Sequence, residues 1–156
     1  MSDDAAREIL RVGARALAHA EAPESVLRLL LGSIAGGLDI ESAAILVPDE
    51  AREHLEVAAS IGLPEAAVAG LASAVRNPDH PVARTFAAPL ASFDVLPTAP
   101  GGPALRTHVP LVVTRDGVEI VLGVLALAHA RPIDTERRPI LQASADLVAV
   151  AIERGR

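Results

Sequence analysis

The stretch RTHVPLVVTRDGVEIVLGVLALAH, residues 106–129, decides the fold class of this chain. Two runs rich in β-branched and aliphatic residues flank the dipeptide Asp116-Gly117, which accepts the positive φ angles of a tight hairpin turn. The stretch therefore predicts an antiparallel β-hairpin. Pro132 and Asp134 then lead into apolar residues at helical spacing, which predict a C-terminal helix over residues 134–154.

Helices and strands are also expected before this hairpin. Apolar residues at helical spacing predict an N-terminal helix over residues 1–20 and a second helix that opens at Pro23. The continuous apolar run 43–47 predicts a buried strand, and the alternating residues 55–61 predict its partner. A short helix is expected over residues 64–75. Runs of helices and strands in this order indicate an α+β fold.

Residues 76–105 form the irregular part of the chain. A helical turn is expected at 82–86 and a short strand at 90–95, and a loop accounts for the rest. Because long loops inside compact domains are often functional, we interpret 76–105 as a lid over a binding site. No internal repeat or domain boundary is visible, so residues 1–156 are interpreted as a single domain.

The composition argues against several classes of function. The formal net charge is −6 and the positive charges are scattered arginines, which does not suit a nucleic-acid surface. No cysteine is present, so a disulfide, a thiol nucleophile, a cysteine zinc site and a thioether-linked chromophore are all excluded. No apolar run approaches the roughly 20 residues that span a bilayer. A cytoplasmic protein without a membrane partner is expected.

Catalytic and metal-binding patterns are not found in the sequence. No serine lies in a Gly-x-Ser-x-Gly elbow, and no two histidines are three or four residues apart. The pair Asp79-His80 is interpreted as a surface turn flanked by prolines. We therefore expect no catalytic residues, no metal site and no enzymatic activity.

Six segments in a fixed order carry a family resemblance. They are SAAILVPD (42–49), LEVAASIGLP (55–64), PVART (81–85), Phe93-Asp94, VPLVV (109–113) and LGVLALA (122–128). In this order they resemble the strands and the third-strand region of GAF domains. With the terminal helices, the resemblance covers nearly the whole chain.

The resemblance implies a central antiparallel sheet of about six strands. The N- and C-terminal helices would lie with the second helix on one face, and the short helix and the Pro-rich loop would cover a ligand pocket on the other. It implies a small-molecule-sensing regulatory domain of a signal-transduction protein. The partner would be a fused or separate effector, such as a kinase, a cyclase or a transcription regulator.

The ligand of such a domain is left unknown. GAF-type methionine sulfoxide reductases and bilin-binding domains work through cysteines, which this chain lacks. Cyclic-nucleotide-binding relatives carry an Asn-Lys pair and a Phe-x-x-x-Asp-Glu segment. Here Asn77 precedes Pro78 and Phe93 directly precedes Asp94, so that pattern is not matched. His108 as an axial haem ligand is not favoured.

A small polar set near the expected pocket supplies the candidate ligand-binding residues: Arg84, Thr85, Asp94, Arg106 and His108. Arg84 or Arg106 could hold a carboxylate or phosphate of an anionic metabolite through paired hydrogen bonds. Alternatively, Arg84 pairs with Asp79 or Asp94 to order the loop. The rival function is a ligand-free structural module, in which alanine and leucine side chains fill the pocket.

Small residues on the terminal helices suggest self-association. They are Gly13, Ala14, Ala16, Ser144, Ala145 and Ala151. Their size allows helices to approach closely, so two helices from each of two chains could form a four-helix homodimer. The alternative is that each helix covers only its own sheet.

Overall fold

The computed structural model of the chain describes residues 3–18, 23–96 and 105–155. The elements, in chain order, are α1 (Asp3–Ala18), α2 (Pro23–Leu38), β1 (Ser42–Pro48), β2 (Leu55–Ile61), α3 (Glu65–Ala74), α4 (Pro81–Ala87), β3 (Ser92–Val95), β4 (Leu105–Arg115), β5 (Val118–His129) and α5 (Arg138–Arg154). The ends of the predicted N-terminal helix and lid residues 97–104 lie outside the described residues.

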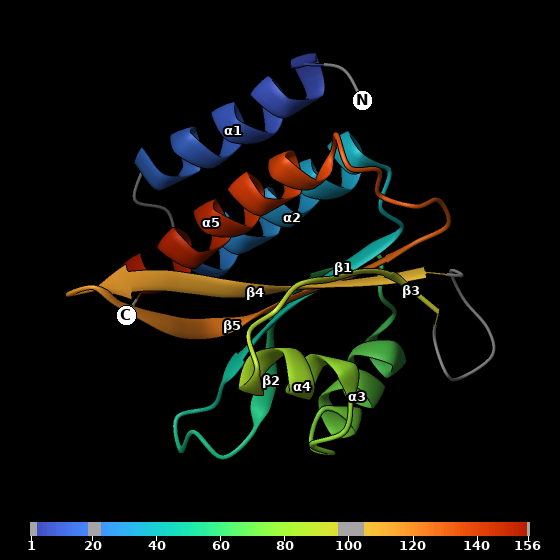
Figure 1. The fold of residues 1–156 in the computed structure, drawn as a ribbon, viewed down its shortest axis with the longest axis vertical. Coiled ribbons are helices and arrows are strands. Elements are labelled where there is room, and N and C mark those ends of the chain that lie inside the picture. The colour runs from blue at the N-terminus through green and yellow to red at the C-terminus, as the bar shows by residue number, and fades with distance from the viewer. Residues whose placement is uncertain (1–2, 19–22, 97–104, 156) are drawn as a thin grey trace.

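One antiparallel sheet organises the molecule, with strand order β2-β1-β5-β4-β3 (Figure 1). Within the described residues it has five strands, one fewer than the roughly six expected. The described part of the Pro-rich stretch contributes only the four-residue strand β3. Proline cannot donate to a strand ladder, and here Pro81 begins the helix α4 instead.

The predicted hairpin is confirmed as β4 and β5. Arg115 pairs with Val118 across the turn, and Asp116 and Gly117 have φ angles of 51° and 79°. Two consecutive positive φ angles match the right-handed twist of the strands, and Asp-Gly adopts them at low cost. The hairpin then places β5 beside β1 in the centre of the sheet.

Three helices cover one face of the sheet, as expected, but they form two layers. Helices α2 and α5 lie on the strands, and α1 lies on top of both (Figure 1). At Gly13 of α1, an added Cβ would come within 2.7 Å of Leu147 and 2.8 Å of Leu30. The missing side chain therefore allows α1 to settle onto α2 and α5. The main core lies below, around fully buried residues such as Leu30, Ile34, Leu125 and Leu141.

The opposite face is covered by α3 and α4, which confirms the expected short helix on that side (Figure 1). A second, smaller core forms there from Leu46 and Val124 of the sheet and from Val75 and Val82 outside it. The helical turn expected at 82–86 is part of α4. No helix in the described residues is both long and apolar enough to cross a membrane.

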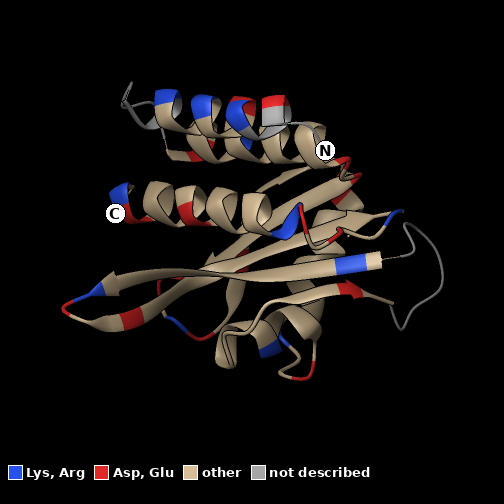
Figure 2. Cartoon of the chain, turned by 45° about the horizontal axis from the view of Figure 1, so that its top comes forward, with Lys and Arg blue, Asp and Glu red and all other residues tan. Residues whose placement is uncertain are grey.

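The C-terminal helix begins at Arg138, a few residues later than residue 134. Asp134 lies before it and accepts a hydrogen bond from the Arg137 N–H at 3.0 Å, so it shapes the turn that leads into the helix. Charged residues lie mainly on the outer helices and at the loops, whereas the middle of the sheet is uncharged (Figure 2).

Candidate functional site

Strand β4 directs successive side chains to opposite faces of the sheet. Val109 and Leu111 belong to the core under the helical layer. His108 pairs with Ala126 of β5, and Ala126 packs against the core under α3 and α4. His108 therefore faces α4, and Arg106, two residues earlier on the same strand, lies on the same side.

His108 is a buried, uncharged imidazole. The residue is 5% exposed, and its Nδ1 lies 3.4 Å from the Ser92 hydroxyl of the edge strand β3. Burial lowers the pKa of His108 to about 4, and the positive charges of His80 and Arg106 add to the effect. At neutral pH the ring therefore offers one N–H donor and one acceptor.

His80, which precedes α4, is the second imidazole of this group. The Val82 N–H donates to its Nδ1 at 3.2 Å, so the proton of the neutral ring lies on Nε2. Burial lowers the pKa of His80 as well. We name His80, Ser92, Arg106 and His108 the imidazole cluster. Sequence reasoning placed His80 on the surface; its position before Pro81 at a helix start could have marked it as a capping residue.

The two predicted residues on α4 lie differently. Arg84 is exposed on the helix surface. Thr85 is buried, and its hydroxyl donates to the Pro81 carbonyl at 2.8 Å, one turn earlier in the same helix. This local bond occupies the Thr85 donor. Of the predicted set, the structure brings together Arg106 and His108, with α4 beside them.

Asp94 points to the other face of the sheet. Its carboxylate accepts the Ile133 N–H at 2.8 Å and the Arg138 Nη2 at 3.3 Å. The Arg138 guanidinium also lies 4.5 Å from the centre of the Phe93 ring, a cation–π distance. Asp94 thus pairs with Arg138 of α5, and the sheet separates it from His108.

A buried chain of hydrogen bonds holds the backbone of Asp94 in place. The Asp94 N–H donates to the Thr107 hydroxyl at 3.2 Å, and that oxygen lies 2.8 Å from the His129 Nε2. The His129 Nδ1 lies 2.7 Å from the Arg131 carbonyl. One tautomer satisfies every group: Nδ1 donates to the carbonyl and Nε2 accepts from Thr107.

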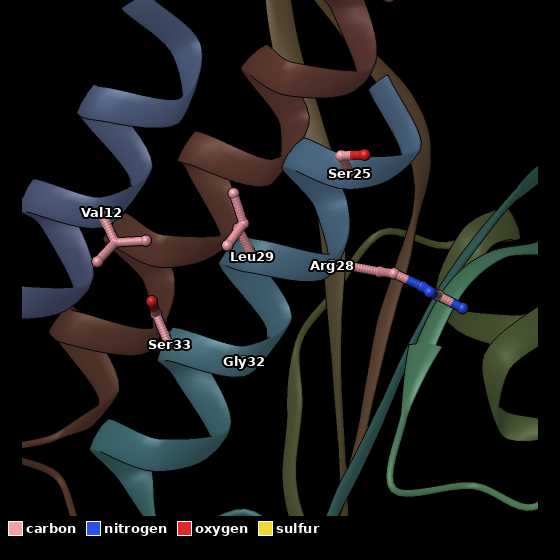
Figure 3. Close-up of a pocket in the computed structure, with 6 residues that line it drawn as sticks. All are labelled: Val12, Ser25, Arg28, Leu29, Gly32 and Ser33. Atoms are coloured by element: carbon pink, nitrogen blue, oxygen red, sulfur yellow. The ribbon is translucent and has the colours of Figure 1, made fainter. Parts of the chain in front are cut away.

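A surface groove of about 560 Å³ lies between α1 and α2, away from the imidazole cluster. Val12, Leu29 and Ser33 lie along it, and Arg28 points away from α1 (Figure 3). The small residues expected to pair two chains lie mostly inside this one: Gly13 contacts Leu147 and Leu30, and the remaining described members except Ala14 are buried.

Metal binding has no visible basis in residues 3–18, 23–96 and 105–155, where no three His, Asp or Glu side chains gather. The arrangement instead suits recognition through hydrogen bonds. Arg106 supplies a cation, and two neutral imidazoles supply donors that can meet the oxygens of a small ligand.

The structure is an α+β domain with a helical layer on one face of the sheet and a short-helix cover on the other. No family model and no curated protein matches the sequence. Solved structures match over nearly the whole chain, and the fold of this chain is the GAF fold.

Three of these structures illustrate the kinds of protein that share this fold. The GAF domain of an Acinetobacter phosphoenolpyruvate-protein phosphotransferase has 15% identity and a TM-score of 0.76, with 99% of this chain and 95% of that chain covered. The second GAF domain of DevS from Mycobacterium smegmatis has 25% identity and a TM-score of 0.68, with 85% and 94% covered.

The third is an enzyme, the free methionine-R-sulfoxide reductase of Neisseria meningitidis, with 14% identity and a TM-score of 0.71 over 100% of this chain and 94% of that chain. Another matching structure is the GAF domain of a putative sensor histidine kinase from Pseudomonas syringae, with 19% identity and a TM-score of 0.68 over 99% of this chain and 91% of that chain. The reductase shows that the same fold also carries catalysis.

Proposed function

We propose that this chain is a regulatory GAF domain that senses a small anionic molecule on its α4 side. The observation that carries the proposal is the imidazole cluster, in which the buried His108 lies 3.4 Å from the Ser92 hydroxyl and has its pKa lowered by burial and by the nearby His80 and Arg106. Groups whose pKa values are shifted by burial and by neighbouring charges gather at functional sites, so such a cluster between a sheet and a cover helix is a reason to expect a ligand.

The ligand chemistry follows from the available groups. A guanidinium can bind a carboxylate or phosphate through two parallel hydrogen bonds, and neutral imidazoles can donate to further oxygens without adding charge. Arg84 is exposed on the surface of α4, so it could contact an anion only from the solvent side of that helix. We therefore assign it a secondary part, with Arg106 and His108 as the main contacts.

Strand β3 offers a route from the ligand to the output. Ser92 contacts His108 on one face, whereas Phe93 and Asp94 hold Arg138 of α5 on the other. A ligand that displaces Ser92 would move the contacts that fix the first turn of α5. Such couplings between sites are typically about 1–3 kcal/mol.

The output would be a change in how α5 packs. We propose that the domain works as a cytoplasmic homodimer and regulates a fused or separate effector, such as a kinase, a cyclase or a transcription regulator. The GAF domain of a putative sensor histidine kinase among the structural neighbours supports the regulatory part of this proposal.

The test is a thermal-shift screen of anionic metabolites, followed by native mass spectrometry of the purified chain. We expect a ligand that raises the melting temperature of the wild type but not of Arg106→Gln or His108→Gln. Arg84→Ala should reduce the shift only partly. The control is Arg52→Gln in the exposed turn between β1 and β2, which should respond as the wild type does. Equal shifts in all variants, or no bound molecule in either experiment, would favour the ligand-free structural module.

A further inference from the structure

The outward side of α2 carries an unusual set of residues. Ser25, Leu29, Gly32 and Gly36 follow each other at steps of three or four, so they share one side of the helix. All four are exposed, and Leu29 keeps 45% of its surface accessible although it is a large apolar side chain. We name these four residues the α2 face.

The two glycines have no role inside the chain. A Cβ added at Gly32 or Gly36 would meet no atom within 4 Å, whereas one added at Gly13 would meet two leucines at 2.7 and 2.8 Å. Glycine in the interior of a helix is unfavourable, because it loses the most conformational freedom on folding. What it allows is the close approach of another backbone.

The groove between α1 and α2 adjoins the α2 face. It is about 560 Å³ in size, and Leu29 and Gly32 form part of its lining together with Val12 of α1 (Figure 3). A helix seated on the α2 face would therefore find a depression beside it for its own side chains.

We propose that the α2 face is a self-association surface, on which α2 of a second copy packs in the antiparallel direction. The occupant is a second copy because, in this direction, Gly32 of each copy can lie opposite Gly36 of the other, as a two-fold interface requires. The inference rests on the homodimer of the proposed function and is independent of ligand binding.

Charge supports this choice of partner and orientation. In an antiparallel pair with Gly32 opposite the partner's Gly36, Arg28 lies level with the partner's Ile40, next to the partner's Asp39. Asp39 is exposed directly after the end of α2, and its φ of 59° is one that Asp tolerates. The two-fold axis relates the two copies, so Arg28 of each copy lies beside Asp39 of the other. The Arg28–Asp39 contact therefore occurs twice.

The helix dipole adds a second reason. The last turn of α2 has no basic residue of its own, although its C-terminal carbonyl groups carry partial negative charge. In the antiparallel pair, Arg28 of each copy lies near that end of the other copy and supplies the missing cation. Arg28 also points away from α1 (Figure 3).

The first experiment measures the dimer dissociation constant of the full chain by sedimentation equilibrium. Gly32→Leu places a side chain where the monomer has open space, so the variant should fold, and we expect the dimer to weaken at least tenfold. The matched control is Gly70→Leu on α3, where an added Cβ also meets nothing within 4 Å. It should dimerise as the wild type does.

A double-mutant cycle tests the ion pair. Arg28→Gln and Asp39→Asn should each raise the dimer dissociation constant several-fold. The dissociation constant of the double variant should not exceed the higher of the two single-variant values. Asn tolerates the positive φ at residue 39. Arg7→Gln on α1 controls for a general effect of charge. Additive effects of the two substitutions would contradict the Arg28–Asp39 contact.

Two outcomes overturn the inference. A wild type that stays monomeric at high micromolar concentration refutes it together with the proposed homodimer. A Gly32→Leu dimer as tight as the wild type refutes the α2 face but leaves a homodimer through other residues. Ligand sensing is judged separately, by the thermal-shift screen on the Gly32→Leu variant, since the imidazole cluster lies on the other face of the sheet.

Discussion

Replacement of His108 should change how the stability of the fold depends on pH. The pKa of this ring falls from 6.5 to about 4 on folding, mainly because the ring is buried. Above about pH 6.5 the ring is neutral in the folded and unfolded chains, and it contributes no pH dependence. Below that value the unfolded chain takes up a proton and the folded chain does not, so the free energy of unfolding decreases.

The size of the effect follows from the two pKa values. The loss should reach about 2 kcal/mol near pH 5 and approach about 3 kcal/mol near pH 4, where the folded ring also begins to titrate. The side chain is only 5% exposed, so solvent reduces this value little. For a domain of this size, the loss is a large part of the total stability.

The assay is urea unfolding of the wild type and His108→Gln at several pH values between 7.5 and 4.5. Carboxylates also titrate in this range, so the informative quantity is the difference between the two proteins. That difference should shift by about 2 kcal/mol in favour of the variant as the pH falls to about 5. His54→Gln, which changes an exposed histidine, is the matched control. Parallel profiles for wild type and His108→Gln would refute the reasoning.

Three further predictions concern the packing of the helices. Asp94→Ala should cost about 1–3 kcal/mol in urea unfolding, because it removes the acceptor of the Ile133 N–H and the partner of Arg138, and Asp94→Asn should cost less because it keeps an acceptor and tolerates the positive φ. An equal cost for both variants would contradict this account. Gly32→Ala should raise the stability of the monomer by about 0.5–1 kcal/mol through helix propensity, whereas Gly13→Ala should lower stability or leave it unchanged, because its Cβ meets Leu147 and Leu30; thermal unfolding at low protein concentration compares them, and a gain at both sites would count against close packing at Gly13. Arg115→Ala should cost no more than about 1 kcal/mol, and less at high salt, since its two hydrogen bonds to Glu153 are partly exposed; a larger, salt-independent loss would show that the pair is worth more than an exposed one.

The parts of the fold that depend on local chemistry could be predicted from the sequence. Asp116-Gly117 specifies its turn within two residues, and the alternation in residues 55–61 identifies β2 without knowledge of its neighbours. The end of α2 shows the limit of such signals. Gly36-Gly37 is a common helix terminator, but the helix continues to Leu38, which is buried in the core, and Asp39 takes the positive φ instead.

The candidate site could be predicted only in part. Ser92 and Asp94 are two apart on one strand, so simple alternation would direct both side chains to one face. The strand is irregular here: Asp94 has a φ of 57° and the register shifts between Ser92 and Val95. This irregularity directs Asp94 to Arg138 on the other face. A contact between residues so far apart in sequence as Asp94 and Arg138 leaves no pattern in a single sequence.

The central place of β5 has a consequence for how the chain folds. The hairpin of β4 and β5 consists of local contacts and can form early, as can the pair of β1 and β2. The two halves join only when Ala43 meets Leu127, across most of the chain. Closing so long a loop is slow, because its entropy must be lost before the contacts form. We therefore expect β1–β5 pairing to be the rate-limiting step, after which the helical layer and the α4 side can both be completed.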